Sequence, residues 1–167
     1  MNQQTLAKIL ATWFFVGKVP FAPGTFGSLA ALPFAYAIFS VFGEWTLLGA
    51  AFFLYFMGIW ASDTYMAAQS DHEHDPAEIV IDEVAGMWCL LALWQILYSQ
   101  QFSISSLHWL VGGFIMFRVF DIFKPWPISW VDAKVKGGFG VMIDDILAAI
   151  FPMAVFYPLS LNIPAML

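Results

Sequence analysis

Charged residues are scarce in this chain of 167 residues, and basic residues are the scarcest of them. Only 11% of the residues are charged, and six lysines and arginines stand against twelve aspartates and glutamates. Proteins that bind nucleic acid need a basic surface, so we expect no nucleic-acid partner. The single cysteine, Cys89, excludes a framework of disulfide bonds within the chain. In contrast, 61% of the residues are hydrophobic, against about 45–50% in soluble domains, and this predicts a membrane protein.

Five apolar runs predict an all-α protein, a polytopic membrane helical bundle that forms one domain over residues 1–167. Each run has 14 to 17 residues, somewhat fewer than the roughly 20 that span a bilayer, so we expect short or tilted helices. The runs are Leu29–Phe42, Trp45–Ala61, Val84–Tyr98, Leu107–Phe120 and Ile146–Leu161. Before them, apolar residues at helical spacing predict an N-terminal amphipathic helix in the membrane interface, with a short core helix as the alternative.

The charged residues lie almost entirely on one side of this predicted membrane topology. If all five runs cross, the loops Lys18–Ser28, Ser62–Glu83 and Arg118–Asp145 share one side, and the other side holds a single charged residue, Glu44. Lysine and arginine accumulate on the cytoplasmic side of membrane proteins, so the charged side should face the cytoplasm. Three loops that are far apart in the sequence can therefore meet on one surface.

Two pairs of neighbouring acids precede apolar runs: Asp82 with Glu83, and Asp144 with Asp145. Carboxylates next to a bilayer are costly unless they are paired or bind a metal. Neighbours on a helix point about 100° apart, so we expect one metal ligand and one supporting residue in each pair. Oxygen ligands of this kind suit Mg²⁺, which keeps several waters and binds phosphate oxygens. The alternative is a network of salt bridges to the nearby basic residues.

A phosphate group could be held at two further places. Arg118 and Asp121 are three residues apart and share a helix face, either as a buried ion pair or as a phosphate ligand with its orienting partner. Thr25 or Ser28 could cap the helix that follows residues 19–28. A glycine-containing turn at the start of this helix would direct backbone N–H groups at a phosphate. An ordinary capped turn that binds no ligand would have the same sequence.

Three stretches stand out as motifs: APGTFGS at 22–28, IVIDEVAGMW at 79–88, and FRVFDIFKPWPISWVD at 117–132 followed by GGFGVMIDD at 137–145. In this order they resemble the phosphatidylglycerophosphatase A family of bacterial membrane phosphatases, over most of residues 20–150. The resemblance implies Mg²⁺-dependent hydrolysis of phosphatidylglycerophosphate to phosphatidylglycerol and phosphate, the last step of phosphatidylglycerol synthesis. It also implies a phospholipid substrate and a site on the cytoplasmic side of the bacterial inner membrane.

The patterns and the resemblance together give three sets of candidate residues. The catalytic candidates are Asp82, Glu83, Asp121, Asp144, Asp145 and Arg118. The metal candidates are Asp82, Glu83, Asp144 and Asp145, with Asp75 and Asp132 added by the resemblance alone. The substrate-binding candidates are Thr25, Gly27, Ser28, Arg118, Lys124, Gly137 and Gly138. Glycines at 137–140 would let backbone N–H groups approach an anion, or would simply permit a turn.

A cation transporter or channel is the alternative from another class, since acids inside a membrane also mark ion pathways. It expects ionisable groups near the middle of the spans, whereas here they cluster at the ends. A scaffold that binds lipid headgroups is a third hypothesis, which would not need the acid pairs. For the enzyme, water activated by a carboxylate-held metal is the expected nucleophile, so we predict no covalent phospho-enzyme. The sequence does not indicate an oligomeric state.

Overall fold

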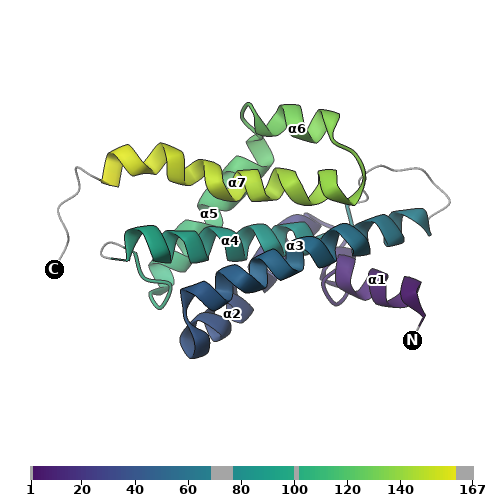
Figure 1. Ribbon diagram of the computed structural model, residues 1–167, viewed down its shortest axis with the longest axis horizontal. Helices are drawn as coiled ribbons and strands as arrows, with labels where there is room; N and C mark the ends of the chain where they lie inside the picture. Colours follow the sequence, from purple (N-terminus) through teal and green to yellow (C-terminus); the bar gives the residue numbers. More distant parts are fainter. Residues whose placement is uncertain (1, 69–76, 100–101, 161–167) are drawn as a thin grey trace.

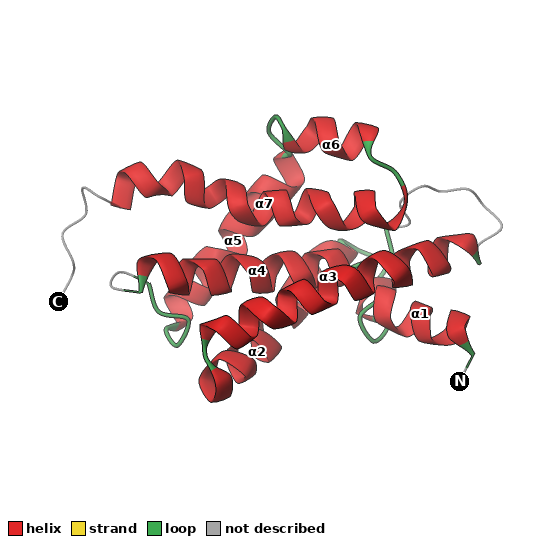
Figure 2. Ribbon diagram, in the orientation of Figure 1, coloured by secondary structure: helices red, strands yellow, loops and turns green. Residues whose placement is uncertain are grey.

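The computed structural model describes residues 2–68, 77–99 and 102–160, with side-chain surroundings as far as residue 154. Over these ranges the chain is all-helical, as Figures 1 and 2 show, and the predicted all-α class is confirmed. In chain order the elements are α1 (Gln3–Ala11), the short 3-10 helix η1 (Val16–Lys18), α2 (Pro23–Phe42), α3 (Glu44–Ala67), α4 (Ile81–Tyr98), α5 (Leu107–Phe123), α6 (Ile128–Lys134) and α7 (Gly137–Ser160).

Four of the described helices, α2, α3, α4 and α7, are long and apolar enough to cross a membrane. Helices α2 and α3 have 20 and 24 residues, because each continues beyond the apolar run that predicted it. Helix α5 has 17 residues, or about 25 Å at 1.5 Å per residue, which is less than the roughly 30 Å of a bilayer core. A full crossing by α5 therefore stays a prediction.

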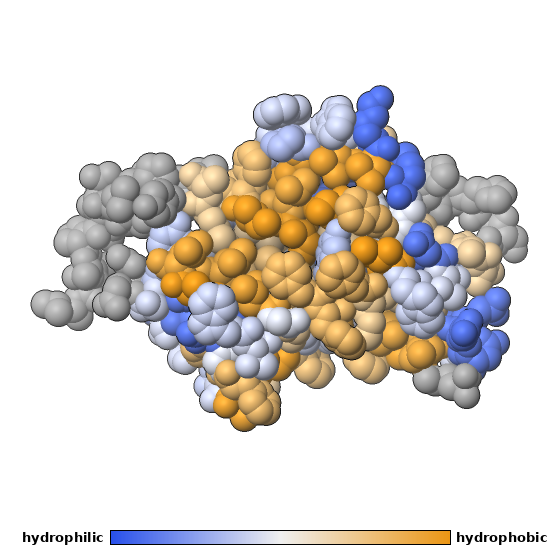
Figure 3. Space-filling model, viewed as in Figure 1, coloured by the Kyte–Doolittle hydropathy of each residue, from blue (hydrophilic) through white to orange (hydrophobic). Residues whose placement is uncertain are grey.

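The end of α3 and the starts of α4 and α7 lie at the same end of the bundle, together with α1 (Figure 1). Two hydrogen bonds join these segments. The N–H of Val80 donates to the carbonyl of Ala11 over 2.9 Å, and the N–H of Gly138 donates to Oδ1 of Asp63 over 2.6 Å. Figure 3 shows apolar side chains over the middle of the molecule and hydrophilic ones near this end. The segments that were predicted to share one side of the membrane therefore lie together.

Helix α4 forms the centre of the bundle and packs against α2, α3, α5 and α7. Twelve of its eighteen residues are buried, which is why its sequence is apolar on every face. Gly86 allows its neighbours to come close: a Cβ atom there would lie 2.7 Å from the ring of Phe117 on α5 and 3.0 Å from the carbonyl oxygen of Asp145 on α7. The start of α4 is thereby held against α7.

Helix α1 forms where the sequence predicts an amphipathic helix. Its side chains at Ala7 and Ala11 are buried, and the helix packs along α3. Its first residues, Gln3 and Gln4, are exposed. The buried face consists of small side chains, so α1 lies close against the bundle at the end where α3 finishes.

Helix α2 begins earlier than the sequence analysis expected. Pro23 occupies its first position, where a proline costs nothing because the first N–H groups of a helix have no partner within it. Thr25 and Ser28 therefore lie inside the helix, and the prediction that one of them caps it is wrong. The hydroxyl of Ser28 donates instead to the carbonyl of Gly24 over 2.8 Å, one turn back in the same helix.

Candidate active site

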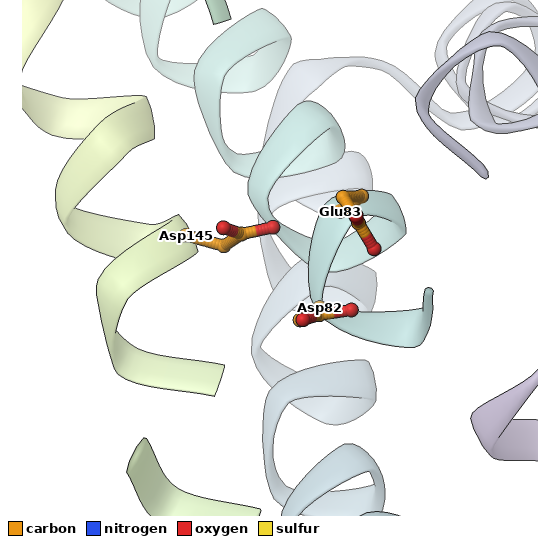
Figure 4. Close-up of side chains that lie close together, drawn as sticks. All are labelled: Asp82, Glu83 and Asp145. Carbon is orange, nitrogen blue, oxygen red and sulfur yellow. The ribbon is translucent and has the colours of Figure 1, made fainter. Parts of the chain in front are cut away.

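Three carboxylates from two helices meet near the end of the bundle where α3 finishes and α4 and α7 begin. Asp82 and Glu83 come from the first turn of α4, and Asp145 comes from α7. One oxygen of each lies within 4.8 Å of the others, and Figure 4 shows Asp145 pointing from its helix toward the start of α4. Only 9% of Asp82 and 3% of Asp145 are exposed. The structure thus brings together both acids of the first predicted pair and one acid of the second; we refer to these three residues as the acid cluster.

Each member of the acid cluster has a buried oxygen without a hydrogen-bond partner among the described residues: Oδ1 of Asp82, Oε2 of Glu83 and Oδ2 of Asp145. Buried polar atoms are normally paired, and neighbouring carboxylates repel one another. Carboxylate oxygens are the ligands that Mg²⁺ prefers, and one oxygen from each of the three residues lies within 4.8 Å of the others. The acid cluster therefore has the donor atoms, burial and spacing that suit a small divalent cation.

Asp144 is not part of the acid cluster and contacts Lys124. The Nζ atom of Lys124 lies 2.5 Å from Oδ2 of Asp144 and 2.7 Å from Oδ1 of Asp132. Burial disfavours the charged form of this lysine, but the two carboxylates outweigh that effect and raise its pKa. Lys124 therefore stays positively charged and connects the end of α5 to α6 and α7. Asp132, which is 41% exposed at its side chain, forms the outer end of this connection.

Arg118 lies between the acid cluster and α2. Its Nη1 atom lies 2.6 Å from Oδ2 of Asp121 and 3.8 Å from Oε1 of Glu83, and it donates to the hydroxyl oxygen of Ser28 over 3.2 Å. The buried ion pair that the i, i+3 spacing predicts is therefore present. A guanidinium has five N–H donors, and the Nε of Arg118 is buried without a partner among the described residues. Arg118 can thus be oriented by Asp121 and still offer donors to a phosphate.

Helix α7 begins at Gly137, so its acids lie two turns inside the helix rather than at its start. The prediction that Asp144 and Asp145 lie at the start of a helix is wrong, and Gly137 and Gly138, which could have formed a turn, begin the helix instead. Gly137 adopts φ +75°, a conformation that glycine accepts readily, and the Asp63 carboxylate accepts the N–H of Gly138. That amide therefore already has an acceptor from α3.

The remaining candidates lie around this centre in different roles. Gly27 packs against Val80, where a Cβ atom would lie 2.7 Å from the valine Cβ, so its small size serves the contact between α2 and the segment before α4. Thr25 is half-buried in the first turn of α2. Asp75 lies outside the described residues, so its predicted role as a metal ligand stays a prediction.

A hollow of about 240 Å³ lies beside the start of α7 and is lined by Asp132, Lys136, Gly137 and Gly140, among others. None of the three residues of the acid cluster lines it. The hollow therefore does not include the acid cluster, although Asp132, which lines it, contacts Lys124.

Two residues that the sequence did not indicate as site candidates lie against the predicted site. Gly24 packs against the carboxylate of Glu83, and Asp63 accepts the N–H of Gly138 at the start of α7. Gly24 lies within the first motif, so the motif was found without the residue that contacts the acids. Asp63 lies near the end of an apolar run on the charged side of the membrane, the same signal that identified the other acids.

Apolar helices and a buried acid cluster near one end define a polytopic helical membrane protein with a candidate metal centre. The sequence model of the phosphatidylglycerophosphatase A family matches residues 9–160. No solved structure matches the chain. The chain belongs to the phosphatidylglycerophosphatase A family, as its three motifs predicted.

Three curated relatives cover most of the chain. Phosphatidylglycerophosphatase A of Escherichia coli (strain K12) is 39% identical over 153 residues, which are 89% of this chain and 80% of the relative. The Haemophilus influenzae protein of the same name is 35% identical over 154 residues, or 91% of this chain and 87% of the relative. A Bacteroides thetaiotaomicron protein, whose name proposes a phosphatidylinositol-3-phosphatase, is 32% identical over 157 residues, with coverages of 87% and 88%.

Proposed function

We propose that this protein hydrolyses phosphatidylglycerophosphate to phosphatidylglycerol and inorganic phosphate with Mg²⁺, as the last step of phosphatidylglycerol synthesis. The observation that carries the proposal is the acid cluster, in which each carboxylate has a buried oxygen with no hydrogen-bond partner among the described residues, with Arg118 beside it. The names of the Escherichia coli and Haemophilus influenzae relatives support the choice of substrate.

Asp82, Glu83 and Asp145 would hold the metal ion. When bound there, Mg²⁺ neutralises charge on phosphate oxygens and makes a water molecule a better nucleophile. Without a cation, four buried carboxylates and the partly buried Glu83 face two cationic side chains in the described part of the site. The carboxylates are Asp82, Glu83, Asp121, Asp144 and Asp145, and the cations are Arg118 and Lys124. Ionised carboxylates in this excess repel a phosphomonoester, so a bound cation would favour substrate binding.

Side chains of the protein bind the phosphate group and transfer the proton of the attacking water. Arg118 donates N–H groups to a phosphate oxygen, and Asp121 fixes the plane of the guanidinium. The oxygen of water forms a bond to phosphorus while the bond from phosphorus to the glycerol oxygen breaks. A carboxylate of the acid cluster accepts the proton that the water loses, and this proton is passed on to the glycerol oxygen as that oxygen leaves. Positive charge that is already in place stabilises the transition state.

The depth of the site suits a lipid whose acyl chains remain in the bilayer. Asp82 and Glu83 are in the first turn of a helix that is long enough to cross the membrane, and Asp145 is two turns inside another. A phosphomonoester at the end of a lipid headgroup reaches this level without leaving the membrane surface. We place the site on the cytoplasmic side, because the lysines and arginines of the chain lie at this end.

A cation transporter would require ionisable groups along the middle of its helices. In α4, the residues after Glu83 contain no charged side chain, and the middle of the helix is filled by residues such as Leu90 and Leu91, both fully buried. On α7, Asp144 and Asp145 lie two turns inside the helix, and no charged residue follows them as far as Ser160. This arrangement favours a site that opens at one face over a pathway that crosses the bilayer.

The test is phosphate release from phosphatidylglycerophosphate in detergent micelles, measured with Mg²⁺, with EDTA, and with EDTA followed by excess Mg²⁺. We expect release with Mg²⁺, at least about a hundredfold less with EDTA, and recovery on adding Mg²⁺ back. Release that is unaffected by EDTA would overturn the metal mechanism. Phosphatidylinositol 3-phosphate is the second substrate in the same assay, because the Bacteroides thetaiotaomicron relative carries that name. Faster release from this lipid would overturn the proposed headgroup and leave the site intact.

A further inference from the structure

Gly24 lies in the first turn of α2 and contacts two charged side chains of the candidate active site. A Cβ atom on Gly24 would lie 2.0 Å from Oε1 of Glu83 and 3.2 Å from Nη1 of Arg118. Real Cβ atoms essentially never come closer than 3.0 Å to a heavy atom of a residue that is not their neighbour in the chain. Any other residue at position 24 would therefore force the Glu83 carboxylate or the α2 backbone to move.

The backbone of α2 is held in place at this point. The carbonyl of Gly24 accepts the hydroxyl of Ser28 over 2.8 Å, and the oxygen of that hydroxyl accepts an N–H of Arg118 over 3.2 Å. Arg118 is in turn 2.6 Å from Asp121 on its own helix. A displacement of Gly24 would break this series of contacts, so the Glu83 carboxylate is the group that would give way.

The Glu83 side chain has little space in which to move. Only 13% of it is exposed, and its second oxygen is buried without a hydrogen-bond partner among the described residues. Moving its first oxygen away from Gly24 changes its distance to Asp82 and Asp145, because these three carboxylates share one small region. The surface of Gly24 thus forms one wall of the acid cluster.

We propose that Gly24 is a positioning residue that sets where the Glu83 carboxylate lies relative to Asp82 and Asp145. The proposal deepens the proposed function, since it concerns the same site. Its requirement is steric: the position must carry no side chain. In a helix, alanine is otherwise favoured over glycine, so helix propensity and this contact predict opposite effects for Gly24→Ala.

Two glycines supply a matched control for the same substitution. Gly112 in α5 and Gly49 in α3 also lie in helices, and a Cβ atom on either would have nothing within 4 Å. Gly112→Ala and Gly49→Ala should leave the unfolding temperature unchanged or raise it. They separate the effect of a new methyl group in a helix from the effect of its contact with Glu83.

The first test is a thermal unfolding cycle in detergent on four proteins: wild type, Gly24→Ala, Glu83→Ala and the double variant. We expect Gly24→Ala to lower the midpoint by at least about 3 °C in the wild-type background, and by less than half as much once the Glu83 carboxylate is removed. If Gly24→Ala does not fold, recovery of folding in the double variant supports the proposal. An equal loss in both backgrounds, or failure of both variants to fold, would overturn it.

The second test measures Mn²⁺ binding by electron paramagnetic resonance, alongside phosphate release. Gly24→Ala should weaken Mn²⁺ binding by about tenfold or more, as loss of a group that orients a metal ligand does, and Gly112→Ala should bind like wild type. Wild-type protein that binds Mn²⁺ but releases no phosphate would refute the proposed function alone. Wild-type affinity in Gly24→Ala would refute the role of Gly24 alone. If wild type binds no Mn²⁺, the unfolding cycle decides.

Discussion

The chain contains one short pattern twice, an isoleucine and two acids followed by an apolar residue, at 81–84 on α4 and at 143–146 on α7. On α4 both acids, Asp82 and Glu83, enter the acid cluster. On α7 only Asp145 does so, and Asp144 is bound by Lys124. Similar local sequences therefore have different contacts in the site. The neighbouring helices determine which of the acids enter the acid cluster.

The difference follows from where each pair lies along its helix. Asp82 and Glu83 are in the first turn of α4, where the helix end leaves space for both side chains to reach the same region. Asp144 and Asp145 are two turns inside α7, where side chains about 100° apart must face different neighbours. The two acids of α7 thus have different partners, whereas both acids of α4 enter the acid cluster; which of them bind a metal stays a prediction.

The largest effect is expected for Asp82→Asn and Asp145→Asn, which keep the shape of the side chain and remove its charge. Each should lower phosphate release by about a hundredfold to a thousandfold, as loss of a charged group that acts on the transition state does. The measurement is the initial rate at saturating Mg²⁺. Glu44→Gln is the control, since Glu44 is also in the first turn of a long helix but at the opposite end of α3 from Asp63. Equal losses in the control and the site variants would show that the assay reports on folding.

Asp144→Asn should have a smaller effect, about tenfold to a hundredfold, because Asp144 acts through Lys124 rather than in the acid cluster. The distinguishing measurement is the Mg²⁺ concentration that gives half the maximal rate. This concentration should rise in Asp145→Asn and change little in Asp144→Asn. If both variants shift it equally, the two acids of α7 have the same role and the comparison with α4 fails.

Lys124→Met tests the contact that separates Asp144 from the acid cluster. It leaves Asp144, whose side chain is 6% exposed, without its lysine, and should cost about 1–2 kcal/mol of stability. The midpoint of thermal unfolding in detergent measures this cost. Lys124→Arg is the matched variant, because it keeps the charge, and it should recover most of the loss. An unchanged midpoint in Lys124→Met would show that the contact contributes nothing to stability.

The smallest effect is expected at the ion pair of Lys18 and Glu78, which lies at the same end of the bundle but faces solvent. Lys18 hydrogen-bonds Glu78 and lowers the pKa of that carboxyl below its ordinary 4.5, with help from Tyr65. The pair therefore stabilises the fold above pH 4.5, and this contribution is lost as the pH falls below that value. Since 42% of the Glu78 side chain is exposed, Glu78→Gln should cost less than about 0.5 kcal/mol at pH 7.

The measurement for Glu78→Gln is the unfolding midpoint at pH 7 and at pH 3. The difference between the variant and wild type should shrink at the lower pH, as Glu78 of the wild type takes up protons. The same hydrogen bond raises the pKa of Lys18 above its ordinary 10.5. The stabilisation that Lys18 contributes is therefore complete below pH 10.5 and is lost as the pH rises above that value. A difference that grows as the pH falls from 7 to 3 would contradict the prediction.

Motif and composition were sufficient to predict the family, the all-α class and the residues of the acid cluster. They did not predict where helices α2 and α7 begin. Residues 23–28 and 137–140 are rich in glycine and proline, and the sequence analysis expected turns there. Both segments are helical, because a proline fits the first position of α2 and Asp63 of a distant helix supplies an acceptor at the start of α7. Short helix α6 was not predicted, since it follows two prolines and has only seven residues.

The sequence by itself determined that the protein is a bundle of apolar helices with its acids at one end, because burying charge in hydrocarbon costs too much for any other placement. Only the tertiary structure decided which carboxylates share a site. Asp144 and Asp145 are adjacent in the chain, yet Lys124 binds one and the start of α4 faces the other. Contacts such as that between Gly24 and Glu83 join segments about sixty residues apart, and no local pattern specifies them because they depend on how closely two helices pack.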